Sequence, residues 1–124
     1  VSERLGAVRE ELEGRVVDAL RESDFGLVEP LDALARRVAT LADSVRHAPA
    51  GYAGLFDAAS VGAAELDRLH AADLAVREAC EKLATAVQGI PTPADAAAPK
   101  RVESALAEAE AAFRRRGETL REVK

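Results

Sequence analysis

The sequence predicts an all-α protein, an antiparallel up-and-down bundle of long amphipathic helices. The apolar residues are mostly Ala, Leu and Val, and aromatic residues make up only 3% of the chain. Ala and Leu are strong helix formers, whereas strands favour β-branched and aromatic residues. The apolar positions recur at steps of three and four residues over long stretches, and no stretch alternates with the period of two that indicates a strand.

Length and composition predict one folded domain. The chain has 124 residues, of which 48% are hydrophobic and 31% are charged. This balance is typical of a globular domain and not of a disordered segment. The absence of Asn and the excess of Arg over Lys indicate a prokaryotic source. We therefore interpret residues 1–124 as a single helical-bundle domain, either a whole protein or a part excised from a larger prokaryotic one.

The first helix is predicted over residues 2–22. Its apolar stripe contains Leu5, Val8, Leu12, Val16 and Leu20, which follow one another at steps of three or four residues. The hydroxyl of a serine at residue 2 is a suitable helix N-cap.

Residues 23–30 are ambiguous. Ser23 to Gly26 resembles a helix stop, and Pro30 resembles a restart at residue 30, because proline is common in a first helical turn. A heptad-like apolar series from Val17 to Val45 nevertheless runs through this stretch with Asp24 as its single interruption. We favour a break or sharp kink followed by a helix over residues 30–47, and one kinked helix stays the alternative. The bundle therefore has either three long helices or four.

Two further helices are predicted over residues 52–88 and 99–123, separated by the breaker Gly89–Pro93. Ser60 and Gly62 offer an earlier interruption, which would leave a shorter helix from about Val61. The two apolar stripes contain Leu66, Leu69, Val76, Cys80, Leu83 and Val87 in the first helix and Val102, Leu106, Ala109, Phe113 and Leu120 in the second. Short connections between such helices favour antiparallel neighbours.

Charge and composition exclude several function classes. A net charge of −5 argues against nucleic acid as a partner, since that binding needs a clustered basic face. Cys80 is the single cysteine, so no internal disulfide forms and a cytoplasmic location is expected. No apolar run reaches the length of a membrane span. The chain also lacks the spacings of zinc, di-iron, phosphate-loop or dinucleotide sites, and we expect neither a metal nor a cofactor.

Charged residues on the apolar seams form the first candidate site. If consecutive helices fold back at residues 48–50 and 89–98, Asp24 becomes level with Asp73, and Asp73 becomes level with Arg115 and Arg116. We expect a polar layer in the middle of the bundle, with an arginine bridging one or both carboxylates. Its simplest role is to fix the helix register. If Asp24 instead caps the second helix, the layer reduces to a pair of Asp73 with an arginine.

His70 is a weak candidate phosphoacceptor. A lone histidine midway along a helix of an acidic bundle invites comparison with histidine phosphotransfer domains. Those domains usually have Lys and Gly three and four residues after the histidine, where this chain has Asp73 and Leu74. A carboxylate at that position repels a phosphoryl group.

Three of the four aromatic residues lie near the predicted breaks. Phe25, Tyr52 and Phe56 are therefore candidate anchors for a partner, with closure of a bundle end as the simpler role. By elimination, the leading hypothesis is a non-enzymatic helical interaction or oligomerisation module that binds another helical protein or itself as a homodimer. The alternative is a bundle that binds a small ligand or relays a phosphoryl group.

Overall fold

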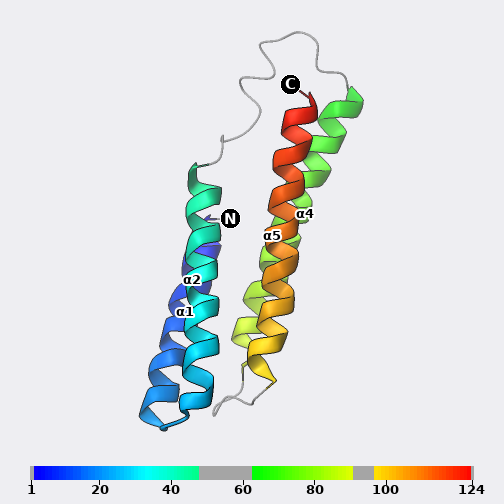
Figure 1. Cartoon of the computed structure of the whole chain (residues 1–124). Helices are drawn as coiled ribbons and strands as arrows, with labels where there is room; N and C mark the ends of the chain where they lie inside the picture. The colour runs from blue at the N-terminus through cyan, green and yellow to red at the C-terminus, as the bar shows by residue number, and fades with distance from the viewer. Residues whose placement is uncertain (1, 48–62, 91–96, 124) are drawn as a thin grey trace.

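The computed structural model describes residues 2–47, 63–90 and 97–123, and this part of the chain is all-α. It contains four helices: α1 (Ser2–Arg21), α2 (Phe25–His47), α4 (Ala63–Gln88) and α5 (Ala98–Val123). Consecutive helices run in opposite directions, so the predicted up-and-down bundle is confirmed (Figure 1). The predicted helical residues 52–62 lie outside the described part.

The bundle consists of two antiparallel hairpins, α1–α2 and α4–α5, which lie side by side (Figure 1). Contacts are more numerous within each hairpin than between them. The hairpins meet through α1 with α4 and through α2 with α5, and these neighbours run parallel. Arg4 of α1 pairs with Glu81 of α4, and Arg37 of α2 pairs with Glu110 of α5. Within the described residues, the backbones of α2 and α4, and those of α1 and α5, do not approach each other closely.

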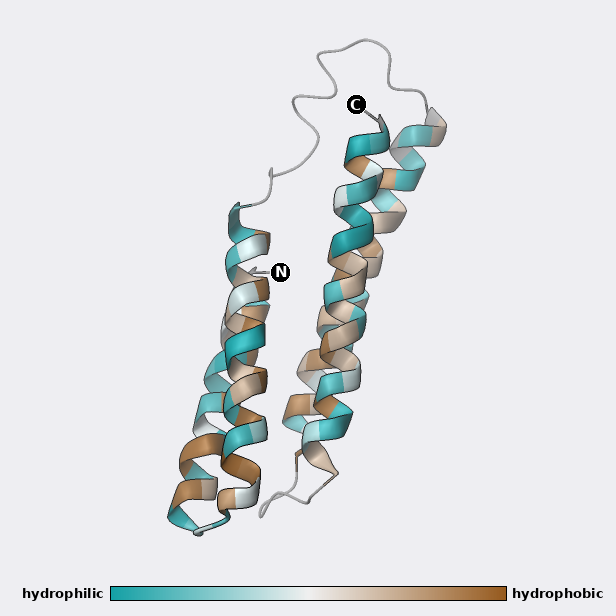
Figure 2. Ribbon diagram, viewed as in Figure 1, coloured by the Kyte–Doolittle hydropathy of each residue, from teal (hydrophilic) through white to brown (hydrophobic). Residues whose placement is uncertain are grey.

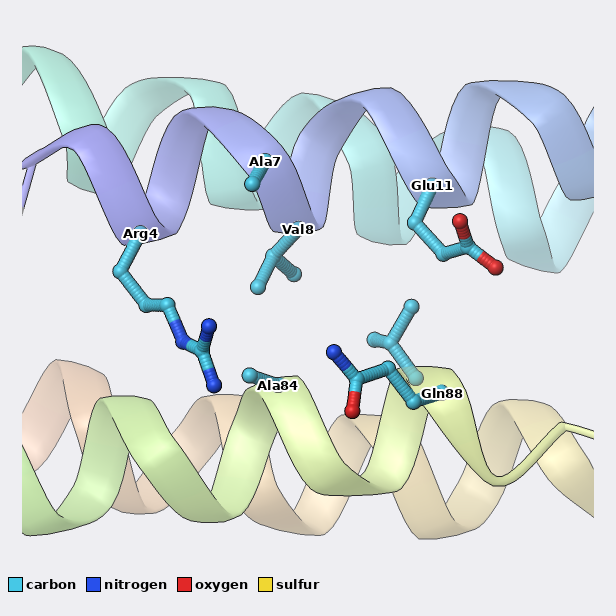
Figure 3. A pocket seen from close by; sticks show the side chains of 7 residues that line it. Arg4, Ala7, Val8, Glu11, Ala84 and Gln88 are labelled. Atoms are coloured by element: carbon cyan, nitrogen blue, oxygen red, sulfur yellow. The ribbon is translucent and has the colours of Figure 1, made fainter.

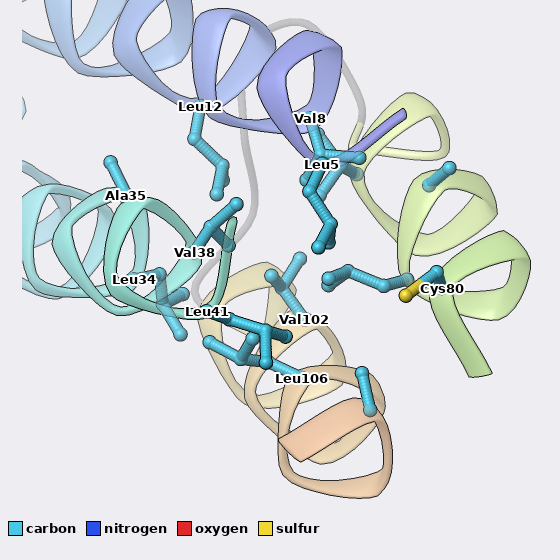
Figure 4. Close-up of a cluster of buried hydrophobic side chains, with 14 of the residues drawn as sticks. Leu5, Val8, Leu12, Leu34, Ala35, Val38, Leu41, Cys80, Val102 and Leu106 are labelled. Carbon is cyan, nitrogen blue, oxygen red and sulfur yellow. The ribbon is translucent and has the colours of Figure 1, made fainter. Parts of the chain in front are cut away.

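The core is formed by the apolar stripes of all four helices (Figure 4). Its largest side chains are leucines and valines, which the predicted spacing had placed on these stripes. The core residues that are at most 1% exposed and at least as large as valine are Leu5, Leu12, Leu31, Val38, Leu83, Val87, Val102 and Leu106. Leu69 is also fully buried but lies outside this cluster, further towards the start of α4.

Helix α1 ends in a Schellman motif at Ser23. The amide of Asp24 donates to the carbonyl of Ala19 at 2.8 Å, and the amide of Ser23 donates to the carbonyl of Leu20 at 3.2 Å. Ser23 has φ of 57°, the left-handed conformation that usually selects glycine at this position. This turn reverses the chain direction, so the break is real and the alternative of one continuous kinked helix is wrong.

The predicted start of the second helix at residue 30 is also wrong, because α2 begins at Phe25. The carbonyl of Asp24 accepts the amide of Leu27 at 3.1 Å, which opens the helix directly after the turn. The early start brings Leu27 into the core with 7% exposure. Pro30 therefore lies inside α2, where it cannot donate to the carbonyl of Gly26. Burial of a leucine side chain contributes about 1.5–3 kcal/mol, which is comparable with the cost of roughly 3 kcal/mol for a proline inside a helix.

Candidate functional site

A partly buried charged pair, Asp73 with Arg116, lies between two helices. The Nε atom of Arg116 donates to Oδ1 of Asp73 at 2.5 Å, joining α4 to α5. Arg116 is only 9% exposed although it carries a full charge. Two helices that slide by one turn shift by about 5.4 Å, which breaks such a contact. The observed contact is therefore compatible with one register of the α4–α5 hairpin.

Two more ion pairs connect α4 to α5 on either side of this pair. Arg68, near the start of α4, pairs with Glu122 near the end of α5. Lys82, near the end of α4, lies 3.7 Å from Glu108 of α5. The residues of all four are exposed, so each pair contributes little stability alone. Sequence reasoning did not identify them, although each pair is equidistant from residue 95, inside the predicted turn at residues 89–98, which was a usable signal.

The other two residues of the predicted polar layer lie elsewhere. Arg115 is exposed, and its carbonyl accepts the hydroxyl of Thr119. Asp24 precedes α2 and lines a cavity with Pro99 and Lys100. This cavity lies at the end of the bundle where α1 passes into α2, which we call the closed end. The structure thus brings Asp73 to Arg116 and does not bring Asp24 to either of them. The layer reduces to one pair, as expected if Asp24 occupies the cap position of α2.

His70 lies on α4 with an exposed side chain, one turn before Asp73. The carboxylate of Asp73 is already engaged by Arg116. Within the described residues, no group of three or more His, Cys, Asp or Glu side chains is arranged to hold a metal ion. The phosphoacceptor role of His70 stays a prediction.

Cys80 is buried at 2% exposure in the face of α4 that packs into the core. Burial raises the pKa of its thiol, and the nearby carboxylate of Glu81 raises it further. A protonated and inaccessible thiol is a weak nucleophile. Cys80 is therefore a packing residue of the core.

Arg37 forms the main polar link between the hairpins. Its guanidinium lies 2.5 Å from Glu110 and 3.6 Å from Glu103, both on α5. The hydrogen bond to Glu110 raises the pKa of Arg37, and the charges of both carboxylates act in the same direction. On the other side of the bundle, Arg4 donates to Glu81 at 2.9 Å. One cation of each helix in the first hairpin thus contacts an acid of the second hairpin.

Two hollows lie between the hairpins. A groove of about 160 Å³ separates α1 from α4, and Arg4, Glu11 and Gln88 lie at its rim (Figure 3). It is smaller than the roughly 300–1,000 Å³ of common ligand pockets. The cavity beside Asp24 is larger, about 430 Å³, and lies between the first turns of α2 and α5. Its walls combine Leu27 and Pro30 with the charged Lys100 and Glu103.

An exposed apolar patch lies at the closed end of the α1–α2 hairpin, where Figure 2 shows hydrophobic residues on both helices. We name Val17, Leu20 and Phe25 the hairpin-end patch; their exposed fractions are 45%, 49% and 67%. Residues nine positions apart point about 180° apart on a helix. Val17 therefore points opposite to Val8, which lines the groove facing α4, and Phe25 points opposite to the buried Leu34. The patch faces away from the second hairpin.

Of the three candidate anchors, the structure describes only Phe25. Phe25 has the largest exposed fraction among the large apolar residues in the described part of the chain. Tyr52 and Phe56 lie outside the described residues. Leu20 was predicted to belong to the buried stripe of the first helix, and this is wrong because half of it is exposed. Ala19 takes the buried position at the end of that stripe instead.

The chain was compared with protein-family models, with curated proteins and with solved structures, and it matches none of them. No helix in the described ranges is long and apolar enough to cross a membrane.

Proposed function

We propose that the chain is a non-enzymatic helical interaction module, an adaptor or oligomerisation domain, which binds another helical protein or a second copy of itself. The hairpin-end patch supports this proposal. Burial of an exposed phenylalanine by a partner stabilises the complex, and aromatic anchors often contribute most of the binding free energy. Phe25 is 67% exposed and two apolar side chains of α1 accompany it at the same end of the hairpin.

The size of the patch sets the expected affinity. Three side chains of this exposure present on the order of 300 Å² of apolar surface, whereas each partner in a stable complex buries about 800 Å². Two copies joined through their patches would bury roughly 600 Å² in total, worth about 15 kcal/mol before the 4–15 kcal/mol cost of association. Self-association through the patch is therefore expected to be weak and reversible.

Sedimentation equilibrium of the purified chain over a wide concentration range tests the proposal. Salt should be varied from about 0.01 M to about 1 M, which reduces the Debye length from roughly 30 Å to roughly 3 Å and screens the negative charge of the chain. We expect weak self-association that strengthens with salt and that Phe25→Ser removes. Leu74→Ser is the matched control, since Leu74 is 54% exposed on the other hairpin.

The outcomes show whether the hairpin-end patch mediates self-association. Loss of self-association in Phe25→Ser and its retention in Leu74→Ser supports the proposal. A strict monomer at every salt concentration would contradict self-association through the patch and leave only a different protein as the partner, whereas equal effects of the two substitutions would contradict the role of the patch. Circular dichroism of both variants checks that the helices remain formed.

A further inference from the structure

The charges around the hairpin-end patch define the chemistry of its partner. We propose that the patch binds a basic amphipathic helix of a different protein. This inference rests on the proposed function and names the class of partner. It follows from the charge that surrounds the patch, from the position of that charge on the helices, and from the area of the patch.

The residues from Val17 to Pro30 are strongly acidic. They include four carboxylates, Asp18, Glu22, Asp24 and Glu29, against the single cation Arg21. Three of the four carboxylates are exposed and Asp24 is partly exposed. No ion pair joins any of them to another residue in the described part of the chain. The apolar patch is therefore bordered by carboxylates that form no ion pair within the described residues, although Asp24 shares a cavity with Lys100.

Two of these carboxylates lie where the fold itself does not favour them. Asp18 is in the last turn of α1 and Glu22 directly follows it, and a helix C-terminus carries partial negative charge. Carboxylates there cost a few tenths of a kcal/mol, whereas cations would stabilise the helix. Local choices that oppose stability are expected at functional sites. An external cation bound at this end would satisfy both the carboxylates and the helix dipole.

The acidic border also decides between a second copy and a different protein. Two copies joined patch to patch would place these carboxylates opposite one another, and like charges across an interface oppose association. The apolar area alone is too small for a stable complex, so a tight partner must also use the border. A helix with leucine-like anchors on one face and Lys or Arg beside them meets both requirements.

The helix spacing presents the apolar and acidic groups together. Glu29 lies four residues after Phe25 on α2, and positions four apart share a helix face. On α1, Val17 and Leu20 are three residues apart and share a face in the same way. A partner helix that crosses this end therefore meets apolar side chains from both α1 and α2, with Glu29 adjacent to its cations.

The binding of two synthetic amphipathic peptides tests the inference. One peptide carries Leu on one helical face and Lys on the other, and its counterpart carries Glu in place of Lys. Fluorescence anisotropy measures the dissociation constant of each labelled peptide at low salt. We expect the Leu/Lys peptide to bind, the Leu/Glu peptide not to bind, and the affinity to fall as salt rises.

Three variants assign the binding to the patch and its border. Phe25→Ser should weaken binding of the Leu/Lys peptide about tenfold, which is typical of a lost anchor. The triple variant Asp18→Asn, Glu22→Gln and Glu29→Gln should also weaken it about tenfold through lost charge complementarity. The matched control removes the same charge from exposed residues of the other hairpin, in a triple variant of Asp67, Glu78 and Glu118. This control should bind within about twofold of the unmodified chain if the charge acts locally.

The outcomes separate this inference from the proposed function. Equal binding of both peptides, lost only in Phe25→Ser, would overturn the basic partner and leave the interaction module standing. Equal weakening by the two triple variants would overturn the inference, since net charge alone would then explain the binding. Binding of the Leu/Lys peptide that Phe25→Ser leaves intact would overturn the role of the patch itself, and so would the absence of any binding.

Discussion

The Asp73–Arg116 pair gives a sharp prediction about stability. The perturbation is a double-mutant cycle with Asp73→Asn, which removes the charge at similar shape, and Arg116→Met, which keeps an unbranched apolar stem. The two side chains are 31% and 11% exposed, so the pair is neither a surface pair worth up to about 1 kcal/mol nor a buried pair whose disruption costs about 3–5 kcal/mol. We expect each single substitution to lower the free energy of unfolding by about 2 kcal/mol.

The double variant carries the decisive information. If the two charges stabilise each other, the second substitution adds little, and the double variant should also lose about 2 kcal/mol. The coupling free energy is then about 2 kcal/mol. For a chain of 124 residues, 1 kcal/mol corresponds to about 4 °C in Tm.

Urea denaturation followed by circular dichroism measures all four proteins of the cycle, and thermal denaturation checks the result independently. Additive effects of the two single substitutions would refute the reasoning, because the 2.5 Å contact would then contribute no interaction energy. An increase in stability for the double variant would retain a register role but exclude a stabilising one.

Two further predictions concern the thiol of the core and the turn after α1. Native Cys80 should react with a disulfide reagent about 100-fold more slowly than the unfolded chain, because it is buried and its pKa is raised. The thiol of the unfolded chain ionises as pH rises through its ordinary pKa of 9.0, whereas the buried thiol stays protonated there, so the free energy of unfolding should fall as pH rises through 9. Cys80→Ala should remove that part of the pH dependence, and an identical dependence in the variant would contradict this. Ser23→Gly should raise the free energy of unfolding by about 1 kcal/mol in urea denaturation, since glycine adopts positive φ without strain; an unchanged or lower value would show that the turn does not strain the serine.

The helices and most of the core could be predicted from the sequence because both depend on local spacing. The stripes of α2, α4 and α5 place Leu31, Leu83 and Leu106 inward, and the structure buries each of them. The breaker at residues 89–93 likewise predicted the separation of α4 from α5. Such features follow from periodicity and from glycine and proline, which act over a few residues.

The position of Leu20 shows where spacing fails. Leu20 fits the apolar stripe of the first helix, and with Val17 it also fits a heptad series that continues into α2 only if one helix spans the turn. The left-handed Ser23 ends α1 and α2 starts in a new phase, so this series does not correspond to one face. Phe25 was recognised as a candidate anchor because aromatic residues are scarce and it lies at the break, while its two companions on α1 were not.

The pairing of the hairpins could not be read from local patterns either. Placing Asp24 level with Asp73 assumed that α2 folds back directly on α4, the usual result of a short connection. In the described residues α2 instead contacts α1 and α5. The choice depends on long-range contacts such as Arg37 with Glu110, 73 residues apart, which no local signal predicts. The sequence could predict the arrangement of the helices within each hairpin, but it could not predict how the two hairpins pack against each other.

The two-hairpin arrangement also determines how the bundle would respond to mechanical force. The start of α1 and the end of α5 both lie towards the end of the bundle opposite the α1–α2 turn, and they belong to different hairpins (Figure 1). Tension between these two points pulls the hairpins apart sideways, so that their contacts separate one after another and not all at once. The hairpins share fewer contacts with each other than their own helices do internally. Under load, the bundle should therefore open between its hairpins while each hairpin stays intact.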